Sequence, residues 1–149
     1  MDKISIKGVE LTKLKIIEHP MGDVFHGLKK SDDGYKGFGE AYFSTIKHKV
    51  IKPWKKHVKM TLNLIVPIGE IRFVMHDNRE NSETNGQFFE VTLSLKNYCR
   101  LTVPPNIWVS FQGIGTTDNL LLNIANLEHD PNEIVRGELD LFAYDWTVY

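Results

Sequence analysis

The stretch that decides the fold is Val50–Arg79, VIKPWKKHVKMTLNLIVPIGEIRFVMHDNR. Apolar residues alternate with others over 62–66 and again over 71–75, and Pro67 and Gly69 lie between the two runs. Alternation with a period of two is typical of a strand that buries one face, and proline and glycine are common in turns. The stretch therefore predicts a strand, a turn and a second strand.

A cluster of basic side chains precedes the first of these strands. Four lysines and a histidine surround the ring of Trp54: Lys52, Lys55, Lys56, His57 and Lys59. Cations, a histidine base and an aromatic ring at the mouth of a sheet are what a small anionic ligand requires. The alternative is that the lysines form a solvated rim in which His57 has no task, and the residues alone leave both readings open.

In the rest of the chain, short extended runs alternate with turn residues, as in a protein built from strands. Extended runs are predicted over 4–17 (two short strands), 24–28, 40–46, 88–95, 98–103 and 107–111, with polar loops over 29–39 and 76–86. Pro104 and Pro105 interrupt the ladder because proline has no N–H to donate. Many short strands at even spacing predict an all-β sandwich or barrel. Its predicted core is Leu62, Leu64, Val66, Ile71, Phe73, Val91, Leu93, Ile107 and Phe111.

One apolar run, residues 120–127, fits two kinds of element. Leu121, Ile124 and Ala125 have helical spacing, but the run is short and lies between turns. These two features favour a buried strand. A helical turn is expected shortly afterwards, around Pro131 and Glu133.

Composition fits a single domain, residues 1–149, and narrows the class of partner. A chain of 149 residues can bury one core, and 18 basic against 19 acidic residues leave no positive excess for binding nucleic acid. The single cysteine, Cys99, cannot form an internal disulfide, so a reducing, cytoplasmic location is expected. No apolar run is long enough for a signal peptide or a membrane span, so no membrane partner is expected.

No metal or other cofactor is expected. Double-sheet barrels of the cupin type often hold a metal between convergent histidines and carboxylates, but the six histidines here are scattered and form no His-x-His pair. The ammonium group of Lys55, two residues from His57, would repel a cation. Glycine-rich phosphate loops and a serine nucleophile elbow are absent from the sequence.

Motifs spread over most of the chain follow the order of a known family. The segment 9–28, VELTKLKIIEHPMGDVFHGL, is similar to its opening strands, and Val50–Lys55 takes the place of its Val-Leu-Arg-Gly-Leu-His motif. Five further matches are Gly69-Glu70-Ile71, Asp77-Asn78-Arg79, the Ser-x-Thr-x-Gly loop at 82–86, the Pro104-Pro105 turn and Asp145-Trp146. Together they resemble the dTDP-4-dehydrorhamnose 3,5-epimerase family, which implies a cupin fold, a jelly-roll barrel also called a double-stranded β-helix.

The resemblance implies a chemistry and also marks departures from it. In the family, a histidine paired with an aspartate removes a proton next to the C-4 ketone of a nucleotide-linked sugar. A lysine stabilises the enolate, and a tyrosine returns a proton on the other face. Here Lys55 takes the place of that histidine, Leu127 that of the tyrosine, and Val109 that of another histidine. His57 lies two residues from Lys55, and alternate residues of a strand share a face, so we expect His57 to be the base and Lys55 to lie beside the enolate.

The remaining site residues follow from the same resemblance. Asp140 or Asp145 is expected to orient His57, Lys52 and Arg79 to hold the diphosphate, and Trp54 to contact the substrate. The implied function is a nucleotide-sugar epimerase or isomerase of cell-surface polysaccharide synthesis, acting on a nucleoside-diphosphate 4-keto-deoxysugar. The alternative, favoured by Leu127, is a sugar-nucleotide or carbohydrate binding module without catalysis that serves as an accessory protein.

A homodimer is the expected assembly. A sheet of many strands has edges that must be covered, and the N-terminal strand from Ile4 is apolar enough to pair across chains. The resembling epimerases also dimerise through exchange of strands between sheets.

Overall fold

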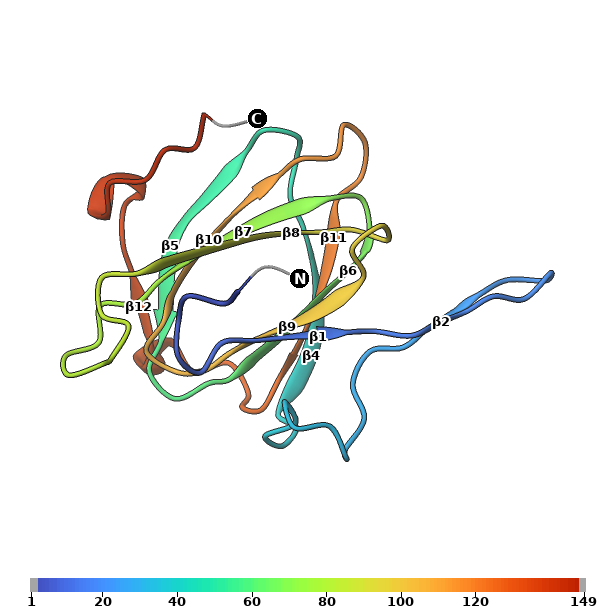
Figure 1. The fold of residues 1–149 in the computed structure, drawn as a ribbon, viewed down its shortest axis with the longest axis horizontal. Coiled ribbons are helices and arrows are strands. Elements are labelled where there is room, and N and C mark those ends of the chain that lie inside the picture. Colours follow the sequence, from blue (N-terminus) through green and yellow to red (C-terminus); the bar gives the residue numbers. More distant parts are fainter. Residues whose placement is uncertain (1–2, 148–149) are drawn as a thin grey trace.

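Two five-stranded antiparallel sheets face each other in the computed structural model, which describes residues 3–147 (Figure 1). The first sheet has the order β1-β9-β6-β11-β4 and the second the order β12-β5-β10-β7-β8. The first sheet contains β1 (Glu10–Lys13), β4 (Glu40–Thr45), β6 (Leu62–Ile68), β9 (Cys99–Val103) and β11 (Leu120–Ala125). The second contains β5 (Ile51–His57), β7 (Ile71–His76), β8 (Phe88–Leu93), β10 (Trp108–Gly113) and β12 (Ile134–Arg136). The all-β prediction is confirmed, while residues 1–2 and 148–149 of the predicted domain lie outside the described part.

The turn between β6 and β7 carries the chain from one sheet to the other. The two strands follow each other in sequence, as predicted, but β6 belongs to the first sheet and β7 to the second. Gly69 makes this turn with φ at +81°, and a Cβ atom there would collide with the backbone of Asp118. Glycine is the residue that accepts both the positive φ and the close approach.

The hydrophobic core fills the space between the sheets. Of the nine predicted core residues, Val91 and Phe111 are partly buried against it and the other seven are buried within it. Ile65 and Asn63 point to the opposite face of β6 and are buried too, because the segment before β4 covers that face. There the Asn63 side-chain amide donates to the Gly34 carbonyl at 3.0 Å.

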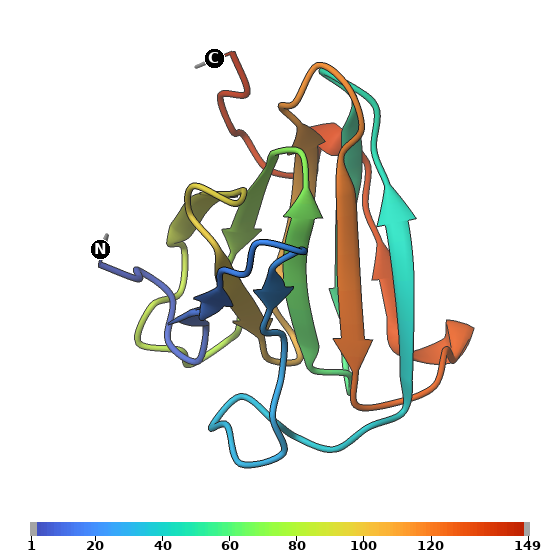
Figure 2. The ribbon, with the colours of Figure 1, turned by 90° about the vertical axis from the view of Figure 1, so that its right-hand side faces the viewer.

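The ambiguous run after residue 119 is a strand. Residues 120–125 form β11, which lies between β6 and β4 in the first sheet (Figure 2). The expected helical turn is the 3₁₀ turn η1 (Pro131–Glu133), and a second one is η2 (Leu139–Leu141). Within residues 3–147, no helix has the length and apolarity that crossing a bilayer requires.

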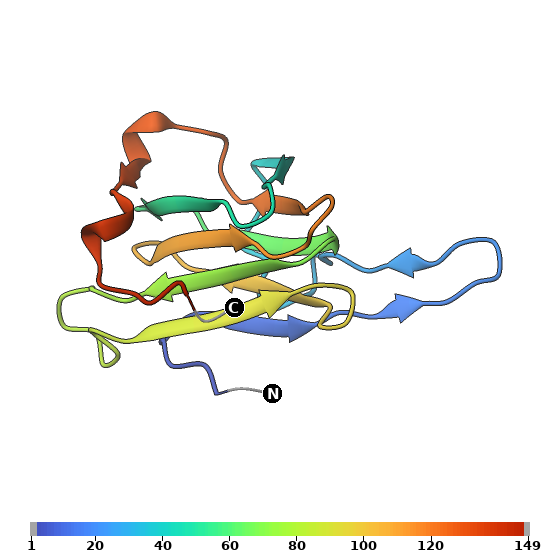
Figure 3. The same cartoon turned by 90° about the horizontal axis from the view of Figure 1, so that it is seen from above.

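The N-terminal region differs in part from the prediction. The two short strands expected in residues 4–17 are β1 and β2 (Ile16–Ile17), but Ile6 and Val9 precede β1 and are buried in the core instead of extending it. The strand expected from Val24 is only β3 (Val24–Phe25). Strands β2 and β3 pair as a narrow hairpin that projects away from the two sheets (Figure 3).

A second, smaller apolar cluster covers the outer face of the second sheet. It contains Trp54, Val74 and Trp108, and aromatic rings of the C-terminal segment pack against it: Phe142, Tyr144 and Trp146. Trp54 and Phe142 meet edge to face with ring centroids 5.4 Å apart, a favourable arrangement of two rings. The C-terminal segment is thereby held against β5 and β10.

Candidate functional site

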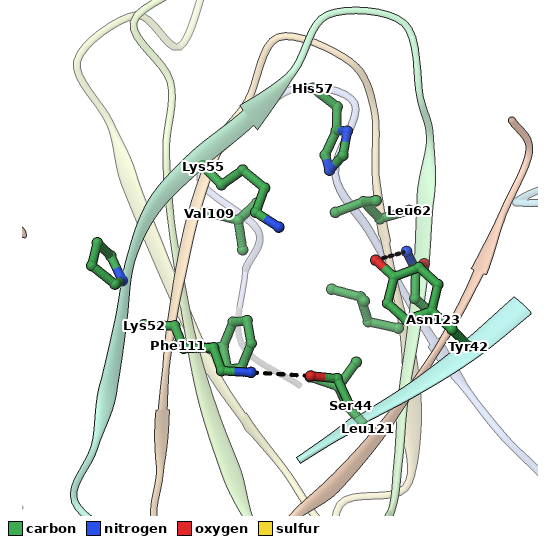
Figure 4. A pocket seen from close by; sticks show the side chains of 12 residues that line it. Tyr42, Ser44, Lys52, Lys55, His57, Leu62, Val109, Phe111, Leu121 and Asn123 are labelled. Atoms are coloured by element: carbon green, nitrogen blue, oxygen red, sulfur yellow. Dashed lines mark hydrogen bonds between the residues drawn. The ribbon is translucent and has the colours of Figure 1, made fainter. Parts of the chain in front are cut away.

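A cavity of about 130 Å³ lies between the sheets, on the side of the barrel where β4 and β5 stand (Figure 4). Strands of both sheets supply its walls. Its lining residues are Tyr42, Ser44, Lys52, Pro53, Lys55, His57, Leu62, Leu64, Val109, Phe111, Leu121 and Asn123. Cationic side chains therefore come from β5 of the second sheet, and hydroxyl and amide groups come from β4 and β11 of the first.

A bulge in β5 determines which of its residues face this cavity. Lys52 is paired with Phe111 and Lys55 with Val109, so two residues of β5, Pro53 and Trp54, stand opposite the single residue Ser110 of β10. An extra residue in one strand shifts the alternation of faces by one. Lys52 and Lys55 therefore both line the cavity although they are three positions apart.

His57 is held by a buried carboxylate, Glu133. Nδ1 of His57 and Oε1 of Glu133 are 2.5 Å apart, and the two residues are only 8% and 2% exposed. Glu133 ends the turn η1, directly before β12, whose Ile134 is paired with His57. With Nδ1 occupied in this way, the rest of the imidazole ring faces the cavity (Figure 4).

The charge of Glu133 is stabilised by several donors. Its Oε2 accepts hydrogen bonds from the backbone N–H groups of Lys59 and Met60, at 3.2 and 3.3 Å. Burial alone would raise the pKa of Glu133, but the hydrogen bonds from His57 and from these backbone groups outweigh burial and lower the pKa below its ordinary value. Glu133 is therefore a carboxylate at neutral pH and accepts a hydrogen bond from Nδ1–H of His57.

Two ammonium groups give the cavity a positive potential. Burial lowers the pKa of Lys55, and the neighbouring charges of Arg136 and Lys52 lower it further, while Glu133 acts in the opposite direction. Nζ of Lys52 donates to the Ser44 hydroxyl at 3.1 Å and to the Thr45 carbonyl at 3.0 Å, which ties β5 to the edge strand β4. A cavity of this charge attracts an anion or an oxygen that gains negative charge.

The wall opposite His57 carries a tyrosine that the sequence did not identify. Tyr42 and Ser44 of β4 and Asn123 of β11 line this side, and Asn123 Nδ2 donates to the hydroxyl oxygen of Tyr42 at 3.1 Å. Apolar side chains, among them Leu62, Leu121 and Val109, fill the remaining walls.

Two of the residues predicted for this site lie elsewhere. Trp54 is adjacent to Lys55 on β5 and faces the other side of the strand; it is 1% exposed and donates from Nε1 to the Leu139 carbonyl at 3.2 Å. Arg79 lies in the loop after β7, where it donates to both carboxylate oxygens of Asp77 at 2.9 Å and to the Lys7 carbonyl at 2.7 Å. Neither side chain lines the cavity. The alternation that puts Lys55 and His57 on one face of β5 also puts Trp54 on the other face.

The carboxylate that contacts His57 also differs from the expected one. Asp140 lies exposed in η2, and Asp145 accepts hydrogen bonds from Thr147, while Glu133 occupies the place beside His57. The sequence did contain a signal for Glu133: the Asp130-Pro131 start of a helical turn fixes its backbone. Its contact with His57, 76 positions away in the sequence, could not be predicted from any local pattern.

The donor groups do not fit a metal site. Among residues 3–147, no three histidine, cysteine or acidic side chains converge on one point. His57 is engaged by Glu133, and its other neighbours in the cavity include the ammonium groups of Lys52 and Lys55. A cation would meet two positive charges there.

Comparisons with known proteins find the same architecture in solved structures. No protein-family model matches the chain. A dTDP-sugar isomerase of Desulfovibrio desulfuricans is 34% identical, with a TM-score of 0.90, over 95% of this chain and 90% of that one. The dTDP-4-dehydrorhamnose 3,5-epimerase of Elizabethkingia anophelis has the same fold at 17% identity, with a TM-score of 0.81, over 99% of this chain and 86% of that one.

A curated relative points the same way. The probable low-salt glycan biosynthesis epimerase Agl13 of Haloferax volcanii is 25% identical over 96% of both chains. The resemblance found in the sequence motifs is thus confirmed over nearly the full length. The chain belongs to the cupin-fold family of dTDP-sugar epimerases and isomerases that includes dTDP-4-dehydrorhamnose 3,5-epimerase.

Proposed function

We propose that this protein is an epimerase or isomerase that acts on a nucleoside-diphosphate 4-keto-deoxysugar by removing a proton from the carbon next to the ketone. The observation that carries the proposal is the placement of the His57–Glu133 pair and Lys55 in one cavity. A base, a group that orients it and a cation for the developing negative charge are the parts that such a proton abstraction needs. Its place would be the cytoplasmic synthesis of a cell-surface polysaccharide, as the glycan epimerase relative suggests.

His57 acts as the general base in this mechanism. Glu133 accepts a hydrogen bond from Nδ1–H, so Nε2 has the free lone pair and takes the proton of the substrate carbon. The imidazolium that forms is stabilised by the Glu133 carboxylate beside it. General base catalysis by a positioned side chain contributes about 10²–10⁴-fold to a rate.

Lys55 stabilises the enolate. The electrons of the broken C–H bond move to the ketone oxygen, which becomes an oxyanion. The ammonium group of Lys55 lies on the same wall as His57, in a cavity that is also lined by the apolar side chains of Leu62, Val109 and Leu121. A fixed charge in such a site stabilises an oxyanion more than it would in bulk water.

The diphosphate lies outside the cavity in this proposal. A volume of about 130 Å³ is below the ~300–1,000 Å³ of sites for drug-sized ligands, so the cavity holds the sugar and leaves the nucleotide at the rim. Lys52 uses two of its three N–H donors on Ser44 and Thr45. The third remains for a phosphate oxygen.

A non-catalytic sugar-nucleotide binding module is the alternative function, because Leu127 has replaced the tyrosine of the family pattern. The two are separated by incubating the protein with a dTDP-4-keto-6-deoxysugar in D₂O and following the proton next to the ketone by NMR. The proposed enzyme replaces this proton with deuterium. Binding of the sugar nucleotide without any replacement would establish the accessory module instead.

We also propose that the protein forms a homodimer through apolar surface of the first sheet. Phe43 is 65% exposed and is paired with Leu122 on the outer face, since their neighbours Tyr42 and Asn123 face the cavity. The hairpin β2–β3 adds Met21 and Val24, 92% and 53% exposed. Exposed apolar side chains of this kind are typical of an interaction surface, and a second copy covers Phe43 together with the edge strand β4.

A further inference from the structure

The side chain of Tyr42 lies on the wall of the cavity opposite His57 (Figure 4). Tyr42 belongs to β4, the edge strand of the first sheet, and His57 belongs to β5 of the second sheet. Both side chains line the same cavity, and Tyr42 remains 40% exposed, so a ligand can reach it (Figure 4). A sugar ring between the two sheets therefore has His57 on one side and Tyr42 on the other.

The hydrogen bonds around Tyr42 leave its own proton available. Oδ1 of Asn123 accepts from the backbone N–H of Asn63 at 3.3 Å, which fixes the orientation of the amide. Nδ2 then donates to the Tyr42 oxygen at 3.1 Å. Because the oxygen acts as acceptor in this bond, the O–H of Tyr42 is directed elsewhere. A donor at the oxygen also stabilises the phenolate that remains once the proton has left.

The other groups on this wall are less suited to give a proton. The oxygen of Ser44 accepts from Nζ of Lys52, but an aliphatic hydroxyl is a far weaker acid than a phenol. Asn123 is engaged on both sides of its amide. Leu127, where the family pattern places a tyrosine, lies beyond the end of β11 and does not line the cavity.

We propose that Tyr42 is the catalytic acid that returns a proton on the face opposite to His57 and so inverts the carbon. This role rests on the proposed function. The enolate electrons move back to the carbon as it takes the proton from the Tyr42 oxygen, and the ketone re-forms. The imidazolium of His57 then loses its proton to solvent and the Tyr42 phenolate gains one, so the cycle is balanced without any oxidant or reductant.

The test separates loss of a proton from inversion. Wild type and Tyr42→Phe are incubated with a dTDP-4-keto-6-deoxysugar in D₂O, and NMR follows both deuterium entry and the appearance of the epimer. We expect Tyr42→Phe to keep deuterium entry within about ten-fold, with the original configuration, because His57 can return the deuteron to the face from which it took the proton. The epimer should form at least about a hundred-fold more slowly.

Tyr98→Phe is the matched control. It also removes a tyrosine hydroxyl, which donates to the His26 carbonyl at 2.8 Å away from the cavity, and it should leave both readouts unchanged. Epimer formation by Tyr42→Phe at the wild-type rate would overturn the role of Tyr42 and leave the proposed function standing. The role of Tyr42 would also be overturned if Tyr42→Phe still folded and bound the sugar nucleotide but lost both deuterium entry and epimer formation. Absence of deuterium entry in the wild type would instead overturn the proposed function and, with it, the role of Tyr42.

Discussion

At the scale of single residues, the site depends on a few side chains whose neighbours define their chemistry. Glu133 is buried, and it is stabilised as a carboxylate by His57 and by the backbone N–H groups of Lys59 and Met60. Lys55 and Lys52, on the same wall as His57, supply positive charge from one strand. The proposed base, its orienting carboxylate and the cation thus come from two short segments around residues 52–57 and 133.

Glu133→Gln tests the orienting carboxylate. Glutamine keeps the shape but loses the charge that stabilises the imidazolium and fixes the ring, so we expect the rate of deuterium entry to fall about a hundred-fold or more. Sugar-nucleotide binding should change little, because Glu133 does not line the cavity. An unchanged rate would show that His57 needs no carboxylate.

The lowered pKa of Glu133 predicts that the stability of the protein depends on pH. The folded pKa of Glu133 is below its ordinary value of 4.5, so its ionised form contributes stability that is fully present above that pH. This contribution is lost as the pH falls through the lower folded pKa. Urea unfolding of wild type and Glu133→Gln should therefore differ most near pH 7 and converge below about pH 4.5. A difference that grows on acidification would contradict this assignment.

Lys52→Ala tests the phosphate contact. A charge-assisted hydrogen bond contributes about 1.5–3 kcal/mol, so its loss should weaken sugar-nucleotide binding about ten-fold or more. The rate of deuterium entry at saturating ligand should stay within a few-fold, since a contact made equally in ground and transition states acts on binding alone. Calorimetry and NMR give the two quantities, and a loss confined to the saturated rate would assign Lys52 to the chemical step instead.

At the scale of elements, the sequence predicted the strands better than it predicted their faces. Alternation gave β6 and β7, and the two-residue spacing correctly put Lys55 and His57 in one cavity. The bulge at Pro53 and Trp54 was not predictable, because it depends on the register between β5 and β10. Glu133 and Tyr42 were missed for a similar reason: each reaches the site through pairing of strands that are distant in sequence.

The loop after β7 gives a prediction of its own, because it holds the Arg79 side chain on Asp77, away from the cavity. Removing one partner of a fully buried ion pair costs about 3–5 kcal/mol. Asp77 is fully buried while Arg79 is 26% exposed, so we expect Arg79→Ala to lower the free energy of unfolding by roughly 3 kcal/mol, the lower end of that range. Chemical denaturation measures this loss. Calorimetry should show that the affinity for the sugar nucleotide stays within about two-fold of the wild-type value. A large loss of affinity without loss of stability would show that Arg79 contacts the substrate.

At the scale of the whole molecule, the family and fold follow from motif order, but the assembly depends on surfaces. The sequence suggested an N-terminal strand from Ile4 as the pairing element, whereas the structure buries Ile6 and Val9 within the chain's own core. Exposed apolar positions instead include Phe43 on β4 and Met21 and Val24 on the hairpin β2–β3. The outward position of Phe43 is visible only once strand pairing has assigned each residue of β4 to a face.

Sedimentation tests the homodimer. We expect wild type to sediment as a dimer at micromolar concentration, and Phe43→Glu to sediment as a folded monomer, because it places a charge on the edge strand that the second copy covers. A monomer of about 17 kDa for the wild type would contradict the proposed interface.

Elemental analysis tests the expected absence of a metal. Purified protein should carry less than one tenth of an equivalent of zinc, iron or manganese after dialysis, roughly the background of adventitious ions, because Lys52 and Lys55 repel cations from the cavity. One retained equivalent would require a different account of the site.

Deuterium exchange by His57→Asn tests the central claim most directly. Asparagine at 57 has no basic nitrogen, so the proton next to the ketone of a dTDP-4-keto-6-deoxysugar should stay in place in D₂O, while binding measured by calorimetry stays within a few-fold. His129→Asn, an exposed histidine outside the cavity, is the matched control and should exchange at the wild-type rate. Full exchange activity in His57→Asn would contradict the account and make Lys55 the next candidate for the base.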